Sequence, residues 1–433
     1  MSVPPSVPTG PTKGKGHKSP TNNGSPPPPS SGGTRSPPSP AGNGHVAPNG
    51  GHAVDGSGTH WVATWTSMQQ QVEPGNMPPS PFSGSSVFRD ATIRQTVHVS
   101  IGASRIRVQI SNVFGSSPLP ISAATVALTA GNRAGVNGIE TNTLQALTFG
   151  GSASTTVAAG STVYSDPVGI SVKPASMLSI SLFSQAGQSG SHITGHPGSR
   201  TTSWMQSGNH VNASTVSGAK TEHWYWLSAV EAWAPASDGA LMILGDSITD
   251  GRGSTDNANN RWPDLLVARL QKNGHGNIGV NNQAAGGNAV LRGGLGPPLL
   301  QRYKRDALQQ QGVKWVLVFE GVNDIGASGS AEQLISAFTT IVKDCKAAGL
   351  KVFGATIPPF KGNSYSSSAH EATREKVNHW ILTSKTYDAV VDFSKMISQG
   401  DALGSRYNSG DGLHPSVAGY QAMADGFPLD IFK

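Results

Sequence analysis

Cysteine, charge and long apolar runs are all scarce in this chain, and each shortage excludes a class of protein. Cys345 is the only cysteine among 433 residues, so no disulfide forms within the chain. Charged residues make up only 13% of the sequence. The net charge is +6, but no dense run of lysine and arginine is present, so we expect no nucleic-acid partner. No apolar run approaches the roughly 18 residues of a membrane-spanning helix, so we expect no membrane span.

The start of the chain also lacks the pattern of a secretory signal. Met1 is followed by Ser-Val-Pro-Pro, without the basic and apolar regions that such a signal contains. Glycine, in contrast, is abundant at 54 residues, and serine and threonine are frequent, which is typical of many secreted β-rich proteins. We therefore expect a secreted, extracellular protein whose signal is absent from this chain. A protein that never carried a signal is the alternative.

Two changes of pattern divide the chain into three predicted parts. Residues 1–58 form a low-complexity tail rich in Pro, Gly and Ser. Such a segment buries too little apolar surface to offset its ordering entropy, so we expect disorder there. Residues 59–237 show a period of two, as in Arg105–Ile110, with turn signals between the alternating runs. This pattern predicts an all-β, sandwich-like domain.

From residue 238 to residue 433 the pattern changes to strands that alternate with helices. The expected strands are 240–244, 313–319, 350–357 and 387–391, and the expected helices are 261–272, 331–348, 368–385 and one capped by Ser416. Repeated βα units of this length predict a parallel sheet between helices. In such sheets functional groups gather at the carboxyl ends of the strands, and Ser247, Gly287 and Asn323 each follow a predicted strand.

Some side chains with chemical potential are predicted to belong to the core instead. Cys345 lies in a segment whose apolar residues recur at helical spacing, so we expect a buried and unreactive thiol. Trp262 and the cluster 224–226 are likewise interpreted as core residues.

Four short motifs in the C-terminal half carry the groups that a serine hydrolase needs. They are residues 244–250 (LGDSITD), 285–288 (AGGN), 321–324 (GVND) and 411–415 (DGLHP). A nucleophilic serine requires a base to take its proton, an acid to orient that base, and fixed donors for the developing oxyanion. The motifs supply a serine after an apolar run and a histidine three residues after an aspartate. A glycine and an asparagine lie between the serine and that aspartate in the sequence.

The order and spacing of these motifs resemble the SGNH (GDSL) hydrolase superfamily over residues 239–433. The resemblance implies a flavodoxin-like domain in which Ser247 is the nucleophile, His414 the general base and Asp411 the orienting acid. It implies an oxyanion hole made by the backbone N–H groups of Ser247 and Gly287 and the side-chain amide of Asn323. No cofactor and no metal are implied. One group of the superfamily carries a β domain before the hydrolase domain, and this chain is similar to that group.

Two of these assignments have an alternative in the sequence. Gly286 is a second candidate for the backbone donor, although matching Asn282 to an upstream asparagine of the family favours Gly287. Asp392 is a second candidate for the acid, although the family's Asp-x-x-His spacing favours Asp411.

Three further residues carry open interpretations. Asp250 and Arg252 closely follow the predicted nucleophile, where they either line the pocket or cap the next helix. His196 is a candidate for an interface between the two predicted domains, close to the site.

The predicted function is a serine esterase that cleaves acetyl or similar short acyl groups from a carbohydrate or another small ester, through an acyl-enzyme. A lipase-like or lysophospholipase-type acylhydrolase is the alternative within the superfamily, but no lid-like apolar helix is apparent. Two other classes remain as rivals. One is a metal-assisted phosphoester hydrolase, and the other is a carbohydrate-binding protein that acts through the β domain.

Overall fold

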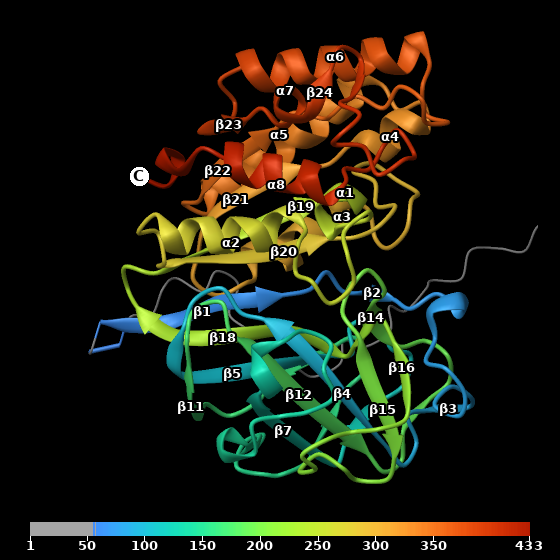
Figure 1. Cartoon of the computed structure of the whole chain (residues 1–433), viewed down its shortest axis with the longest axis vertical. Helices are drawn as coiled ribbons and strands as arrows, with labels where there is room; N and C mark the ends of the chain where they lie inside the picture. The colour runs from blue at the N-terminus through green and yellow to red at the C-terminus, as the bar shows by residue number, and fades with distance from the viewer. Residues whose placement is uncertain (1–54, 57) are drawn as a thin grey trace, which may run out of the picture. The chain divides into compact units, whose positions relative to one another are not determined.

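The computed structural model describes residues 55–56 and 58–433 (Figure 1). The predicted tail, residues 1–58, lies almost entirely outside the described residues. The described residues all fall within one compact unit. The domain boundary after residue 237 therefore stays a prediction, and the segments before and after it are called here the β-rich part and the α/β part.

The β-rich part contains two large antiparallel sheets. The strands of the first, in spatial order, are β16 (Ala219–Thr221), β15 (Ser203–Ser207), β4 (Ala91–His98), β12 (Met177–Ser184), β7 (Ala123–Leu128) and β8 (Gln145–Ala146). The strands of the second are β1 (Thr59–Thr66), β18 (Leu227–Pro235), β5 (Ala103–Ser111) and β10 (Thr162–Tyr164), with β11 (Val168–Val172) also paired to β5.

Short elements connect these sheets. The short strands are β2 (Gln70–Gln71), β3 (Ser86–Val87), β6 (Leu119–Ile121), β9 (Thr155–Val157), β13 (Gln188–Ser189), β14 (Thr194–His196) and β17 (Trp224–Tyr225). The short 3-10 helices are η1 (Pro74–Asn76), η2 (Ala130–Asn132) and η3 (Thr141–Thr143). The β-rich region expected from the period-two pattern is present.

One buried core joins the two large sheets. Ile106 on β5 and Ile93 on β4 belong to the same cluster of buried side chains. On β12, however, the serines between the apolar residues are buried too. The reason is Arg94 on β4, which is fully buried, donates to Ser181 Oγ over 2.9 Å and donates to the carbonyl of Asn137 over 2.9 Å. The segment that contains Asn137 therefore covers the polar face of this sheet.

The α/β part is built on a five-stranded parallel sheet. Its strands, in spatial order, are β20 (Ile278–Ala284), β19 (Gly239–Gly245), β21 (Val313–Phe319), β22 (Lys351–Ala355) and β23 (Ala389–Val391). Numbered along this part, the order is 2-1-3-4-5, which is the flavodoxin-like order. The sequence predicted β21 residue for residue, whereas β22 and β23 are shorter than expected. Beyond β22, the N–H of Ile357 turns to the side chain of Asn378 and leaves the sheet.

Helices pack around this parallel sheet (Figure 1). They are α1 (Ser247–Asp250), α2 (Trp262–Lys272), α3 (Leu299–Tyr303), the π-helical turn η4 (Lys304–Leu308), α4 (Val322–Gly326), α5 (Ala331–Ala347), α6 (Ser368–Thr383), α7 (Phe393–Ile397), α8 (Val417–Gly426) and the 3-10 turn η5 (Leu429–Phe432). A short hairpin is formed by β24 (Ser398–Gln399) and β25 (Ala402–Leu403). As predicted, Ser416 caps α8, where its hydroxyl accepts from the N–H of Gly419. The expected core residues Cys345, Trp262 and Trp224 are buried.

The β-rich part covers the edge strand β20 of the parallel sheet (Figure 1). The N–H of Val280 donates to Ser100 Oγ over 3.0 Å, and the side chain of Asn281 donates to the carbonyl of Ala63 over 2.9 Å. Val62 also belongs to the buried cluster of the α/β part. Covering β20 in this way protects a sheet edge that would otherwise be open to pairing. Among the described residues, no helix has the length and apolar character needed to cross a membrane.

Candidate active site

Ser247, His414 and Asp411 meet at the carboxyl end of β19, although they lie far apart in the sequence. Ser247 is the first residue of α1, two residues beyond the end of the strand. Its Oγ lies 2.7 Å from His414 Nε2. The other ring nitrogen, Nδ1, lies 2.6 Å from Asp411 Oδ2. The three residues predicted to act together are therefore in a continuous hydrogen-bonded chain.

The second carboxylate oxygen of Asp411 builds the turn that carries the histidine. Asp411 Oδ1 accepts from the N–H of Leu413 over 3.0 Å and from the N–H of His414 over 2.9 Å. One side chain thus forms the turn and contacts the imidazole. The alternative acid, Asp392, has other partners. It caps α7 through the N–H of Lys395 and accepts from the hydroxyl of Thr356.

The charge state of this chain follows from burial and hydrogen bonding. Burial lowers the pKa of His414 below its usual value, Asp411 acts in the opposite direction, and Arg252 and Arg200 lower the pKa further. Partial burial raises the pKa of Asp411, but hydrogen bonds from the backbone and ring of His414 and from the N–H of Leu413 lower it to about 2. At neutral pH a neutral imidazole therefore faces a carboxylate. Nδ1–H donates to Asp411, which leaves Nε2 to accept the proton of Ser247.

The glycine pair that follows β20 is divided by Asp250. The N–H of Gly286 donates to Asp250 Oδ2 over 2.8 Å, whereas the N–H of Gly287 donates to no group of the described residues. Gly287 has a φ of 70°, in the left-handed region. A Cβ there would lie 3.1 Å from two carbon atoms of Leu295. The turn thus needs glycine at position 287. The N–H of Gly286 is bonded to Asp250, whereas among the described residues the N–H of Gly287 is left free to bind a ligand.

Asn323 enters the same site from the start of α4. Its Nδ2 donates to the carbonyl of Asn288 over 2.7 Å, and its Oδ1 accepts from the hydroxyl of Tyr365 over 3.0 Å. The Asn288 contact fixes which end of the amide is the donor, because a carbonyl oxygen can only accept a hydrogen bond. One of the two Nδ2 hydrogens remains for a ligand. Ser247, Asp411, His414, Gly287 and Asn323 all line a single cavity of about 550 Å³.

Comparison with protein families agrees with this arrangement. The family model described as "GDSL-like Lipase/Acylhydrolase family" matches residues 243–422. The match supports the predicted resemblance to the SGNH (GDSL) hydrolase superfamily for this segment. No curated protein matches the chain.

Several solved structures resemble the chain over less than half of its length. An acetyl xylan esterase from Geobacillus stearothermophilus is 22% identical, with a TM-score of 0.36, covering 45% of this chain and 96% of that one. A psychrotrophic esterase from Pseudoalteromonas is 19% identical, with a TM-score of 0.35, covering 44% and 94%. A member of the lipolytic G-D-S-L family from Veillonella parvula is 17% identical, with a TM-score of 0.34, covering 43% and 94%.

A buried contact between His196 and Asp250 links the α/β part to the β-rich part directly beside the glycine turn. His196 Nε2 lies 2.9 Å from Asp250 Oδ1, and His196 Nδ1 lies 2.9 Å from the carbonyl of Met68. Both ring nitrogens therefore lie within hydrogen-bonding distance of an oxygen atom. Of the two interpretations open for Asp250, the structure supports pocket lining. Its carboxylate joins His196 to the N–H of Gly286, and no sequence pattern announces that link.

A buried arginine of the α/β part, Arg302, connects several residues below the site, and it was not predicted from the sequence. Arg302 is fully buried and donates to the carbonyl of Gly245, to Asn288 Oδ1 and to Glu320, each over about 3 Å. It thereby ties the end of β19 to the residue whose carbonyl receives Asn323. Burial raises the pKa of Glu320 to about 8, against the opposing effect of Arg302. Asp246 caps α1 next to Ser247, and burial raises its pKa to about 7.

Groups that would suit a metal are otherwise engaged. Both oxygens of Asp324, in the motif that suggested a metallohydrolase, accept backbone N–H groups, from Val290 over 2.8 Å and from Leu291 over 2.9 Å. Within the part of the chain that the structure describes, no group of three or more His, Cys, Asp or Glu is arranged to hold a metal ion.

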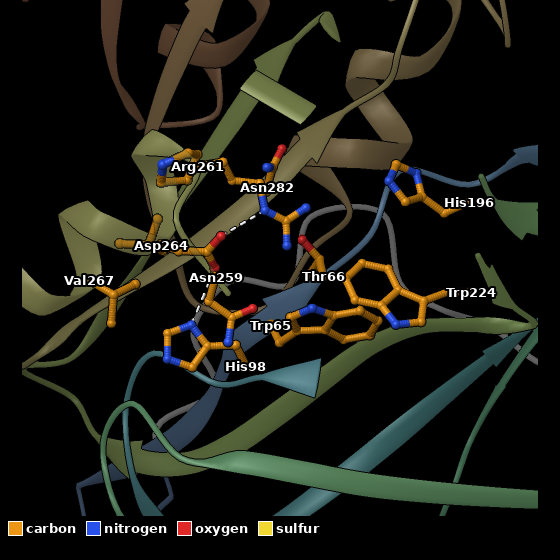
Figure 2. A pocket seen from close by; sticks show the side chains of 12 residues that line it. Trp65, Thr66, His98, His196, Trp224, Asn259, Arg261, Asp264, Val267 and Asn282 are labelled. Atoms are coloured by element: carbon orange, nitrogen blue, oxygen red, sulfur yellow. Dashed lines mark hydrogen bonds and ion pairs between the residues drawn. The ribbon is translucent and has the colours of Figure 1, made fainter. Parts of the chain in front are cut away.

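A second cavity is lined by His196 and by residues of both the α/β part and the β-rich part (Figure 2). The ring of His196 stacks on Trp224 at 5.8 Å between centroids. Across the cavity, Asp264 pairs with Arg261 over 2.7 Å and with His98 over 3.3 Å. The volume of this second cavity is about 30 Å³, which accommodates ordered water but no ester. The 550 Å³ cavity at Ser247, in contrast, has room for a substrate.

Proposed function

We propose that the chain is a serine esterase that hydrolyses short acyl esters through an acyl-enzyme. The observation that carries this proposal is the unbroken line of hydrogen bonds from Ser247 Oγ through the His414 ring to Asp411, with lengths of 2.7 and 2.6 Å. A hydroxyl so placed can lose its proton at the moment of attack.

Acylation begins when Ser247 Oγ attacks the ester carbonyl carbon and His414 Nε2 takes the hydroxyl proton. The imidazolium is stabilised by the carboxylate of Asp411, which stays ionised because its pKa is about 2. The negative charge on the former carbonyl oxygen is held by the N–H of Ser247, the N–H of Gly287 and Nδ2 of Asn323. Each such donor typically contributes about 3 kcal/mol to transition-state stabilisation.

Collapse of the tetrahedral intermediate breaks the bond to the alcohol. His414 Nε2 returns its proton to the leaving alcohol oxygen, so the alcohol departs neutral and Ser247 remains acylated. A water molecule then takes the place of the alcohol, and His414 removes its proton as the water attacks the acyl carbon. The same donors hold the second oxyanion, and the proton returns to Ser247 as the carboxylic acid leaves.

The lining of the cavity supports a short acyl group and a polar alcohol. Most lining side chains are polar, and the apolar ones are Leu295, Leu413, Pro197 and the ring of Tyr365. A long acyl chain needs a continuous apolar channel, which this lining does not offer. Gln70 and Glu73, from the β-rich part, also line the cavity. We therefore propose that the β-rich part contacts the substrate and that a carbohydrate ester suits the site better than a lipid.

The test is hydrolysis of p-nitrophenyl esters from acetate to palmitate, with Ser247→Ala assayed in parallel. We expect kcat/KM to fall steeply beyond short acyl chains and the variant to lose about 10⁴-fold or more of kcat. Folding of the variant is checked by its melting temperature, since a single lost hydroxyl should leave the core intact. Activity that survives in Ser247→Ala would remove the nucleophile from the proposal, and a preference for palmitate would favour the lipase alternative.

A further inference from the structure

We propose that the natural substrate is an ester whose alcohol portion carries an anionic group, and that Arg200 and Arg252 bind this anion. The inference rests on the proposed esterase function and names the substrate class for that site. Both arginines line the 550 Å³ cavity that contains Ser247 and His414.

The two arginines are the cations of this cavity whose donors are left without partners. Within the described residues, neither guanidinium makes an ion pair or a hydrogen bond. Nε of Arg200 is buried and has no hydrogen-bond partner. A buried donor without an acceptor costs free energy, typically about 1–3 kcal/mol, unless a ligand supplies one.

The carboxylates that line the cavity are already occupied by donors of the protein. Glu73 accepts from the side chains of Gln70 and Asn76. Asp250 is shared between His196 and the N–H of Gly286, and Asp411 between the turn and the His414 ring. The open hydrogen-bonding capacity of the charged groups in the cavity therefore lies with the arginines, and it calls for acceptor oxygens.

The backbone at Arg200 indicates that its position is imposed. Arg200 has a φ of 50°, in the left-handed region that arginine rarely adopts. Its carbonyl accepts from the N–H of Asn257 over 2.8 Å, which holds the loop in that conformation. Such strain persists where the surrounding structure over-determines it, and it clusters at sites of ligand contact.

The chemistry of the reaction assigns the anion to the alcohol portion. His414 returns its proton to the alcohol oxygen, so the alcohol lies on the side of the imidazole. Arg252 and Arg200 are close enough to His414 for their charges to lower its pKa. The donor of the glycine turn, Gly287, instead lies beside Leu295.

Guanidinium groups recognise planar and tetrahedral oxyanions through forked hydrogen bonds. A carboxylate close to the esterified hydroxyl, as in an acylated sugar acid or hydroxy acid, fits a cavity lined by two arginines. A sulfate or phosphate shares that chemistry. The experiment therefore includes both a carboxylate and a sulfonate probe.

The experiment compares esters that differ only in charge on the alcohol portion. The probes are 3- and 4-acetoxybenzoate, their neutral methyl esters and 4-acetoxybenzenesulfonate, each corrected for its spontaneous hydrolysis. We expect wild-type kcat/KM to favour at least one anionic ester by at least about tenfold. Arg200→Gln and Arg252→Gln should each reduce that preference by about tenfold. Arg292→Gln, an exposed arginine that does not line the cavity, serves as the matched control and should leave the preference unchanged.

A second readout does not depend on the variants. The anionic product 4-hydroxybenzoate should inhibit the wild-type protein competitively, and more strongly than its neutral methyl ester. Hydrolysis of the neutral esters through Ser247 without any anionic preference would overturn the inference and leave the esterase proposal standing. Absence of Ser247-dependent hydrolysis of every probe would overturn both.

Discussion

Three carboxyl groups near Ser247 have different protonation at neutral pH because their partners differ. Asp411 is held charged, with a pKa of about 2, by the N–H groups of its turn and by the His414 ring. Asp246 and Glu320 are buried below the site, and burial raises their pKa values to about 7 and about 8. Asp411, which faces the imidazole, is therefore ionised at neutral pH, and in the proposed mechanism its charge favours proton transfer from the serine.

This electrostatic arrangement predicts the pH dependence of hydrolysis. The proposed mechanism requires neutral His414, so kcat/KM should fall as the pH drops through a pKa below the usual value of about 6.5. Arg252→Gln removes a positive charge that disfavours the imidazolium, so the acid limb should move to higher pH. The measurement is kcat/KM for p-nitrophenyl acetate between about pH 4 and 9, with Arg292→Gln as control. An acid limb that stays in place or moves to lower pH would contradict the placement of Arg252 beside His414.

The residues that could be predicted are those whose roles follow from local pattern. Ser247, Asp411 and His414 were identified from motifs, and the structure brings them together. The choice between Gly286 and Gly287 depends on Asp250, which takes the first N–H. No local pattern gives that contact, since it joins residues on different elements, and the same holds for the partners of Arg302.

At the scale of elements, the loop between β14 and β15 reaches into the site and depends on a glycine. Gly198 lies against Asp250, and a Cβ on it would stand 1.8 Å from Asp250 Oδ2. That oxygen is the one that accepts from the N–H of Gly286. The packing of this loop on α1 thus determines the position of the glycine turn.

Gly198→Ala should therefore lower activity without removing any reacting group. The added methyl group displaces the Asp250 carboxylate, and the turn that carries Gly287 shifts with it. Misplacement of a donor by about 1 Å typically costs on the order of a hundredfold in rate, so we expect kcat to fall by at least about tenfold. Gly169→Ala on β11, where an added Cβ meets nothing within 4 Å, is the matched control. Equal kcat in the two variants would show that the loop does not position the turn.

Element boundaries were predictable where apolar periodicity is strong and less so where polar partners intervene. The strand β21 and the helix α5 follow their patterns closely. The strand β20, in contrast, contains Asn281 and Asn282, which interrupt an apolar run. Their side chains bond to the carbonyls of Ala63 and Thr249. A strand that is polar because another part of the chain covers its edge gives little signal of its own.

At the scale of the whole molecule, two histidine–aspartate pairs join the β-rich part to the α/β part. His196 pairs with Asp250 at the glycine turn. His98 pairs with Asp264 at the start of α2 (Figure 2). The first pair is almost completely buried, with 3% and 2% of its side chains exposed. The two pairs thus make the same kind of connection, but only one of them touches the site.

Substitution of the two histidines should separate stability from activity. His196→Ala leaves Asp250 buried without its partner, which typically costs about 3–5 kcal/mol of stability, and it should also lower kcat by at least about tenfold. His98→Ala should lower the melting temperature less and leave kcat within about twofold of the wild type. The measurements are thermal unfolding and kcat at a temperature where both variants are folded. Equal kcat in the two variants would mean that the β-rich part supports the fold and not the site.

The buried thiol of Cys345 has a practical consequence. It is completely inaccessible on α5, and burial raises its pKa to about 12. A thiol-reactive dye can therefore modify the native protein only when α5 separates from the sheet. Because the chain has no other cysteine, the labelling rate of the unmodified sequence measures how often α5 separates from the sheet. With Cys345 silent in the folded state, one cysteine added at the cavity rim would report on substrate entry alone.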